Sequence, residues 1–98
     1  MTTCRLHGLV AATHTPFHAD GSLALEAVEA QAGLLHADGV RFAFIGGSTG
    51  EAHSLTLEER QRLAQRWMEV VRGTDLKVVV HVGSNCLADA RVLAAQAE

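Results

Sequence analysis

The sequence predicts an α/β protein built on a parallel sheet, and three observations support this. Three short apolar segments, residues 6–12, 41–45 and 77–82, are each followed by a longer segment with the periodicity of an amphipathic helix. The second and third segments are almost continuously apolar, as is typical of parallel strands covered on both faces. Strands and helices that alternate in this way form a parallel sheet through right-handed crossovers. No linker interrupts the 98 residues, so we expect a single domain over 1–98 without an internal boundary.

The first strand is expected to stop near Thr15-Pro16, because proline lacks a backbone donor for the sheet. The sequence Asp20-Gly21-Ser22 then predicts a turn and offers a helix N-cap. The helix that follows should end at residues 38–39, where glycine permits the chain to reverse. Its expected apolar face consists of Leu25, Val28, Ala32 and Leu35.

The second helix has the clearest start signal, since Thr56 and Glu59 have the spacing of a capping box. Its apolar stripe contains Trp67, whose spacing favours a packing role over a ligand platform, and Gly73 is expected to end it. The other members of the stripe are Leu63, Val70 and Val71. A third helix is expected from about Leu87, with Ala90, Leu93, Ala94 and Ala97 on one face.

Composition narrows the class of partner. The net charge of −3 and the absence of a lysine or arginine cluster argue against a nucleic-acid surface. No apolar stretch reaches the ~18 residues that would span a membrane. The apolar run at residues 9–12 is also too short for a signal-peptide core, so a cytoplasmic protein is expected. A small-molecule substrate is therefore the expected partner.

Cysteine and histidine give no metal signature. Cys4 and Cys86 are far apart and outside any C-x-x-C pattern, which favours reduced thiols over a disulfide or a thiolate site. Six histidines are present, but none forms an i, i+4 pair on an expected helix. His81, near the end of a strand, is expected to be a core histidine with one nitrogen satisfied, and His53 is expected near a pocket rim. We therefore expect no metal site.

The segment most indicative of function is Gly46-Gly47-Ser48-Thr49-Gly50-Glu51, directly after the second strand. Glycines there let the backbone approach an anion closely, and the Ser48 and Thr49 hydroxyls with nearby amides can donate to carboxylate or phosphate oxygens. We call residues 46–51 the cradle. An ordinary glycine-rich turn between a strand and a helix is the alternative. Glu51 is expected to be a buried acceptor for loop amides, because a carboxylate in the site would repel an anion.

Four segments together resemble the pyruvate-dependent class I aldolases, the family of dihydrodipicolinate synthase and N-acetylneuraminate lyase. They are residues 8–17, the cradle, residues 54–60, and His81-Val82-Gly83. The resemblance implies the N-terminal three β/α units of a TIM (β/α)8 barrel, which needs roughly 250 residues in all. The 98 residues would then be a partial domain, inactive alone, of a protein that forms a homotetramer.

The resemblance also implies an activity, the reversible cleavage of N-acetylneuraminate to N-acetylmannosamine and pyruvate. Within the family, dihydrodipicolinate synthase or another pyruvate-dependent sugar-acid aldolase is the alternative. A non-catalytic carboxylate- or phosphate-binding α/β module is an alternative of another class. Against a nucleotide-binding loop, Glu51 stands where a Walker motif has lysine, and the Rossmann glycine spacing is absent.

Family chemistry implies a lysine Schiff base and a tyrosine that transfers protons, but the sequence has no tyrosine and only one lysine, Lys77. Lys77 begins the third strand, and five residues at about 3.3 Å each place it roughly 16 Å from the carboxyl edge. The catalytic lysine and tyrosine are therefore expected beyond Glu98, with no catalytic residue in this chain. No cofactor or metal is expected, because the imine is itself the electron sink.

Substrate contacts are expected at the carboxyl ends of the strands, where barrel enzymes place their sites. By resemblance, Ser48 and Thr49 match the hydroxyl residues that hold the carboxylate of pyruvate or sialic acid. Gly47 belongs to the same expected substrate-binding set. Thr15 is a weaker member, more typical of a residue that caps the backbone beside the site.

Overall fold

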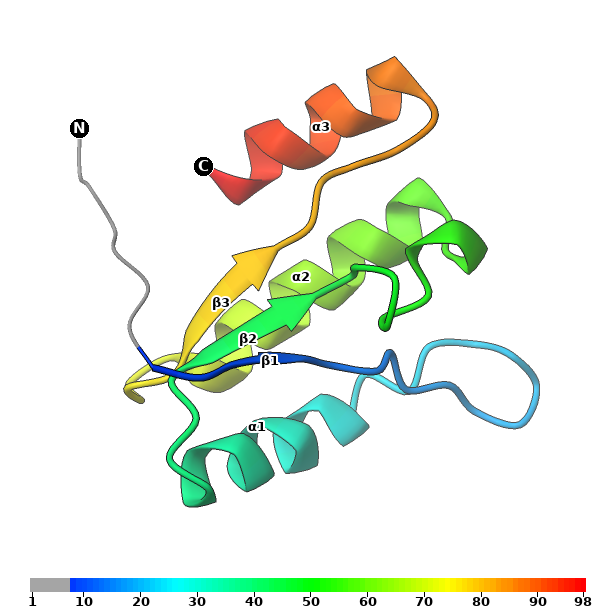
Figure 1. Cartoon of the computed structure of the whole chain (residues 1–98). Coiled ribbons are helices and arrows are strands. Elements are labelled where there is room, and N and C mark those ends of the chain that lie inside the picture. The colour runs from blue at the N-terminus through cyan, green and yellow to red at the C-terminus, as the bar shows by residue number, and fades with distance from the viewer. Residues whose placement is uncertain (1–7) are drawn as a thin grey trace.

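Strands and helices alternate along the chain in the computed structural model, which describes residues 8–98 (Figure 1). The strands are β1 (Val10–Ala12), β2 (Phe42–Ile45) and β3 (Lys77–Val80). The helices are α1 (Ala27–Ala37), α2 (Leu57–Val71) and α3 (Leu87–Ala97), with a short 3-10 turn η1 (Ala52–Ser54) ahead of α2. The predicted alternation is confirmed. Residues 6 and 7 of the expected first strand lie outside the described residues, and β3 ends two residues before the predicted Val82.

The sheet has the order β1-β2-β3, and both pairs are parallel. Val10 is opposite Phe42, which is opposite Lys77, so the strands run in step. Two further bonds extend the pairing past the strand ends, from the Thr13 amide to the Phe44 carbonyl (3.1 Å) and from the His81 amide to the Ile45 carbonyl (3.0 Å). The loops after all three strands therefore leave from one edge of the sheet, which we call the carboxyl edge.

One face of the sheet is covered by α1 and α2 (Figure 1). Ala43 and Ile45 of β2 are fully buried there, together with Val28 of α1 and Leu63 of α2. Trp67 is 1% exposed in the same cluster, so its predicted packing role is confirmed. Fully burying a large apolar side chain stabilises a fold by about 1.5 to 3 kcal/mol, which makes this layer the main source of stability.

The opposite face of the sheet is partly open among residues 8–98, although Phe42 on this face is buried. Strand alternation and register put Val10, Phe44 and Val79 on this face. Val10 is 43% exposed, and the other two are only half-buried. A sheet with helices on one side and open apolar residues on the other has the layout of a barrel wall, whose inner face is filled by side chains of the remaining strands.

The start of α1 differs from the prediction. The turn at residues 20–22 forms, but α1 begins only at Ala27, after Glu26, whose side chain makes no capping bond. The Asp20 carboxylate instead accepts from the amide (2.9 Å) and the hydroxyl (2.7 Å) of Ser22, which lowers the pKa of Asp20. A bridge between Phe17 and Leu23 closes the same turn. These local bonds satisfy the turn within itself, so the N-cap expectation for this segment was wrong.

The start of α2 agrees with the prediction in full. The Thr56 hydroxyl accepts from the Glu59 amide (3.0 Å), and the Glu59 carboxylate accepts from the Thr56 amide (2.9 Å). This capping box fixes the N-terminus of α2 shortly after the cradle, and Gly73, in a left-handed conformation, follows its end. None of the helices described in residues 8–98 is long and apolar enough to cross a membrane.

We expect the 98-residue chain, prepared alone, to lack a cooperative unfolding transition. Its sheet has one open face and two unpaired edges among the described residues, so much apolar area that would normally be buried stays in water. Urea titration followed by circular dichroism should show a broad transition or association. A sharp two-state transition of a monodisperse monomer would contradict the interpretation of residues 1–98 as a partial domain.

Candidate functional site

The cradle lies at the carboxyl edge, directly after β2. Its glycines at 46, 47 and 50 are buried, whereas Ser48 and Thr49 are exposed. The loop is held by backbone bonds from the Glu51 amide to the Ser48 carbonyl (3.0 Å) and from the Ala52 amide to the Gly47 carbonyl (3.1 Å). Within residues 8–98, the amides of Ser48 and Thr49 donate to no other backbone group. Two hydroxyls and two amides are therefore available as donors to an anion.

Close packing explains why glycine occupies two cradle positions. A methyl group at Gly47 would come within 2.5 Å of the Phe44 ring. At Gly50 it would come within 3.0 Å of the Gly46 amide nitrogen and 3.2 Å of the Thr13 carbonyl. The cradle is thus pressed against β2 on one side and against the segment after β1 on the other.

Thr15 reinforces the cradle from the β1 side. Its side chain is 5% exposed, and its hydroxyl donates to the carbonyl of Gly50. This bond joins the loop after β1 to the loop after β2, across 35 residues of sequence. The geometry supports the backbone-capping role expected for Thr15, and direct substrate contact by Thr15 stays a prediction.

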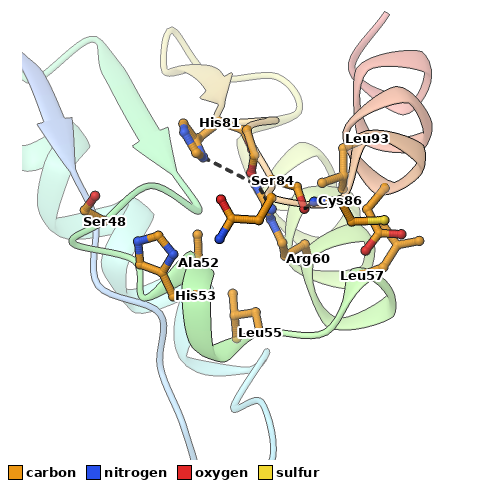
Figure 2. Close-up of a pocket in the computed structure, with 13 residues that line it drawn as sticks. Ser48, Ala52, His53, Leu55, Leu57, Arg60, His81, Ser84, Cys86 and Leu93 are labelled. Carbon is orange, nitrogen blue, oxygen red and sulfur yellow. Dashed lines mark hydrogen bonds between the residues drawn. The ribbon is translucent and has the colours of Figure 1, made fainter.

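A cavity of about 500 Å³ opens at the carboxyl edge between η1, the start of α2 and the segment that leads into α3 (Figure 2). Ser48 lies at one end of it, and His53 lies between Ser48 and Arg60 (Figure 2). Of the predicted substrate-binding residues, Ser48 lines this cavity, while Gly47, Thr49 and Thr15 do not. The polar side chains of the lining are Ser48, His53, Arg60, His81, Ser84, Asn85 and Asp89.

Arg60 is the site residue that the sequence analysis missed. It comes from the first turn of α2, yet it is only 8% exposed. Its guanidinium donates to the Gly83 carbonyl (2.7 Å) and to the His81 carbonyl (2.8 Å). Burial lowers the pKa of Arg60 and Asp89 partly opposes this, but a guanidinium stays charged at neutral pH. A sequence signal existed, because Arg60 stands seven residues before Trp67 and so lies on the buried stripe of α2.

His81 links two parts of the site. Its Nδ1 lies 3.3 Å from the Arg60 guanidinium, which can only donate, so Nδ1 is the acceptor. Its ring meets the Phe44 ring edge to face, with centroids 5.9 Å apart. One satisfied nitrogen was predicted correctly, but His81 is half-buried and lines the cavity, so it is not a core residue. His53, expected at the rim, lines the cavity and is exposed.

The expectation for Glu51 was wrong. Glu51 is exposed and has a left-handed backbone conformation, with φ of 61°. Its carboxylate accepts no hydrogen bond from residues 8–98. The physical reason lies in the cradle itself, whose carbonyls at Gly47 and Ser48 already accept from the amides of Ala52 and Glu51 at the start of the next turn. No buried carboxylate is needed there.

Metal-binding side chains do not gather in the part of the chain that the structure describes. No group of three or more histidine, cysteine or acidic residues there is placed to hold an ion. Cys86 is a free, exposed thiol, and Cys4 lies outside the described residues. The prediction that the protein needs neither metal nor cofactor stays a prediction.

Comparison with sequence models of protein families shows to which family the chain belongs. The sequence model of the dihydrodipicolinate synthetase family matches residues 5–98. The chain belongs to the dihydrodipicolinate synthetase family. The resemblance that the cradle and its flanking motifs suggested is therefore confirmed.

Individual family members support the same assignment. N-acetylneuraminate lyase A of Xenopus laevis is 42% identical over 94 residues, which are 95% of this chain and 31% of that protein. The solved N-acetylneuraminate lyase of Proteus mirabilis is 40% identical with a TM-score of 0.90, over 96% of this chain and 32% of that one. A sialic acid aldolase of Ruminococcus gnavus, solved as a catalytic lysine mutant, is 28% identical with a TM-score of 0.83, over 90% and 29% of the two chains.

These matches bear on the fold and on the length. The three β/α units are those of a TIM barrel of this family, so the fold prediction is confirmed. The chain spans 31% of the length of the Xenopus laevis lyase and a similar share of the two solved structures. These matches therefore do not by themselves assign the activity of the complete protein.

We expect Gly47→Ala to destabilise the complete polypeptide by about 1 to 3 kcal/mol, the usual cost of overpacking. The added methyl would overlap the Phe44 ring, which is held between the cradle and His81. Gly33→Ala is the matched control, because Gly33 lies in α1 with nothing within 4 Å of the added methyl. Thermal unfolding should show a lower Tm for Gly47→Ala and an equal or higher one for Gly33→Ala. Equal Tm values for Gly47→Ala and the wild type would show that the cradle accommodates the added methyl group without strain.

Proposed function

We propose that the chain is the N-terminal part of an aldolase that cleaves N-acetylneuraminate to N-acetylmannosamine and pyruvate through a lysine Schiff base. The observation that carries the proposal is the cradle, in which Ser48 and Thr49 are exposed at the carboxyl edge with their amides not used by the backbone. Identities of 35% to 42% to proteins named N-acetylneuraminate lyase support this member of the family.

The cradle suits the carboxylate of a 2-oxo acid. Ser48 and Thr49 supply hydroxyl donors, their amides add two more, and Gly47 lets the loop pack closely on the Phe44 ring. A hydrogen bond to a charged group contributes about 1.5 to 3 kcal/mol, so several of them would both bind the carboxylate and orient the keto carbon. Thr15 would act indirectly, by holding the Gly50 carbonyl and hence the loop.

The remaining chemistry needs a lysine and a tyrosine, which we place beyond Glu98. The lysine amine adds to the keto carbon and water leaves, giving a protonated imine. Cleavage of the carbon–carbon bond then leaves its electron pair on the imine as an enamine, while the hydroxyl beside the broken bond gives its proton to the tyrosine and becomes the aldehyde carbonyl. Protonation of the enamine carbon regenerates the imine, and water hydrolyses it to release pyruvate and the lysine. Lys77 is unsuited to this role, because it is exposed at the first residue of β3, at the far end from the cradle.

Two alternatives remain beside this proposal. Dihydrodipicolinate synthase or another pyruvate-dependent sugar-acid aldolase would use the same cradle with a different aldehyde. A binding protein of another class would keep the cradle and lack the lysine. We also propose that the complete protein is a homotetramer, as the family resemblance implies, with a small molecule as its substrate.

Thr49→Val and Ser48→Ala, each made in the complete polypeptide, should lower kcat/KM for N-acetylneuraminate cleavage by about tenfold to a hundredfold. Each removes one hydrogen bond to a carboxylate, worth roughly 1.5 to 3 kcal/mol. Ser54→Ala is the control, because Ser54 is an exposed hydroxyl of η1 outside the cavity lining and should behave as wild type. Unchanged kcat/KM in both cradle variants would remove these residues from the site.

The complete wild-type polypeptide also distinguishes the proposed function from its two alternatives. Treatment with pyruvate and borohydride, followed by mass spectrometry, should give one adduct on a lysine other than Lys77. An adduct without N-acetylneuraminate cleavage would favour another aldolase of the family. A protein with no adduct would be a binding module, and an adduct on Lys77 would overturn the barrel placement.

A further inference from the structure

We propose that Arg60 is a positioning residue for the carboxylate site, acting on the cradle through His81 and Phe44. The inference rests on the proposed function, since it assigns a residue to that same site. Arg60 itself lies on α2, outside the cradle, and lines the neighbouring cavity beside His81 (Figure 2). Its effect on the substrate is therefore indirect.

Arg60 holds the segment after β3 at two points. Its two terminal nitrogens donate to the carbonyls of His81 and Gly83, at 2.8 and 2.7 Å, and one of them also faces Nδ1 of His81. The planar guanidinium can serve these acceptors at once, whereas a lysine ammonium has no such fork. The capping box fixes the first turn of α2 and therefore the backbone of Arg60. From this fixed position the guanidinium anchors the segment after β3.

A continuous set of contacts leads from His81 to the cradle. The His81 ring lies against Gly83, where an added methyl would come within 2.8 Å of it, and forms a T-shaped contact with the Phe44 ring. The Phe44 ring in turn lies within 2.5 Å of the position that a methyl on Gly47 would take. Arg60, His81, Phe44 and Gly47 therefore form one packed series from α2 to the cradle.

A buried cation with this geometry is more than a stability element. Leaving charge in a largely buried position costs free energy, and a hydrophobic residue would pack on the stripe of α2 without that cost. Unlike a hydrophobic residue, the guanidinium fixes the positions of two carbonyls and the orientation of one ring at the carboxyl edge. The orientation of the His81 ring determines that of the Phe44 ring, and the Phe44 ring holds the cradle in the geometry that binds the carboxylate.

The test uses the complete polypeptide with Arg60→Lys, which keeps the charge and loses the fork, and with Phe44→Leu, which removes the ring contact without touching Arg60. Each should raise the KM for pyruvate in the condensation direction about tenfold, with kcat changed much less. The double variant should raise KM little more than either single one, because both act through the same contacts. Arg62→Lys is the control, as Arg62 is exposed on the same helix.

The outcomes are distinct. A pyruvate KM within twofold of wild type in Arg60→Lys would show that Arg60 is an anchor for stability alone. Multiplying effects in the double variant would show that Arg60 does not act through Phe44, and would overturn the proposed series of contacts. If Arg60→Lys fails to fold, Phe44→Leu decides, since an unchanged KM there breaks the series between His81 and the cradle. Wild-type protein that forms no pyruvate adduct would reject the proposed function and this inference together. A normal adduct with unchanged KM values would reject the inference alone.

Discussion

The parallel pairing of β2 between β1 and β3 is the constraint on which the rest of the structure depends. Because the three strands run in step, the segments that follow them leave from one edge, and two bonds beyond the strands continue the pairing to Thr13 and His81. The cradle is thereby placed between two neighbouring loops. Burial of Ala43 and Ile45 against α1 and α2 fixes which face β2 presents to the helices. The chain leaves the strand geometry at Gly46, whose φ is positive, and the cradle then packs against the Phe44 ring on the other face.

Close contact between rings and glycines gives the carboxyl edge its rigidity. Gly47 lies under the Phe44 ring and Gly83 lies against the His81 ring, so each loop is packed where it leaves its strand. The two rings meet edge to face, which joins the loops to each other as well as to the sheet. A hydroxyl or amide placed on such a support loses little freedom when it binds an anion, and that is the physical basis of preorganised binding.

The sequence predicted best those features whose cause is local. The capping box at Thr56 and the apolar stripe that contains Trp67 depend on residues three to eight positions apart in one helix, and both were predicted correctly. Arg60 was missed because its partners lie 21 and 23 residues away, across the gap between a helix and a loop. Glu51 was misjudged for a related reason, since cradle carbonyls already accept from the amides of Glu51 and Ala52, and the Glu51 side chain is left in solvent. Side-chain burial in a loop follows from such competition, which periodicity does not describe.

In the proposed enzyme, different groups would recognise the carboxylate and the aldehyde. The cradle is proposed to bind a carboxylate, a group that pyruvate and sugar acids share, so it would not distinguish one aldehyde from another. The open face of the sheet, with Phe44 and Val79 half-buried among residues 8–98, can contact only what the rest of a barrel would add. Selection among aldehydes then requires groups outside the cradle, such as the polar side chains that line the neighbouring cavity or side chains supplied by the rest of the barrel. Arg60 is proposed to act on the pyruvate half through the cradle, which separates affinity for the carboxylate from the choice of aldehyde.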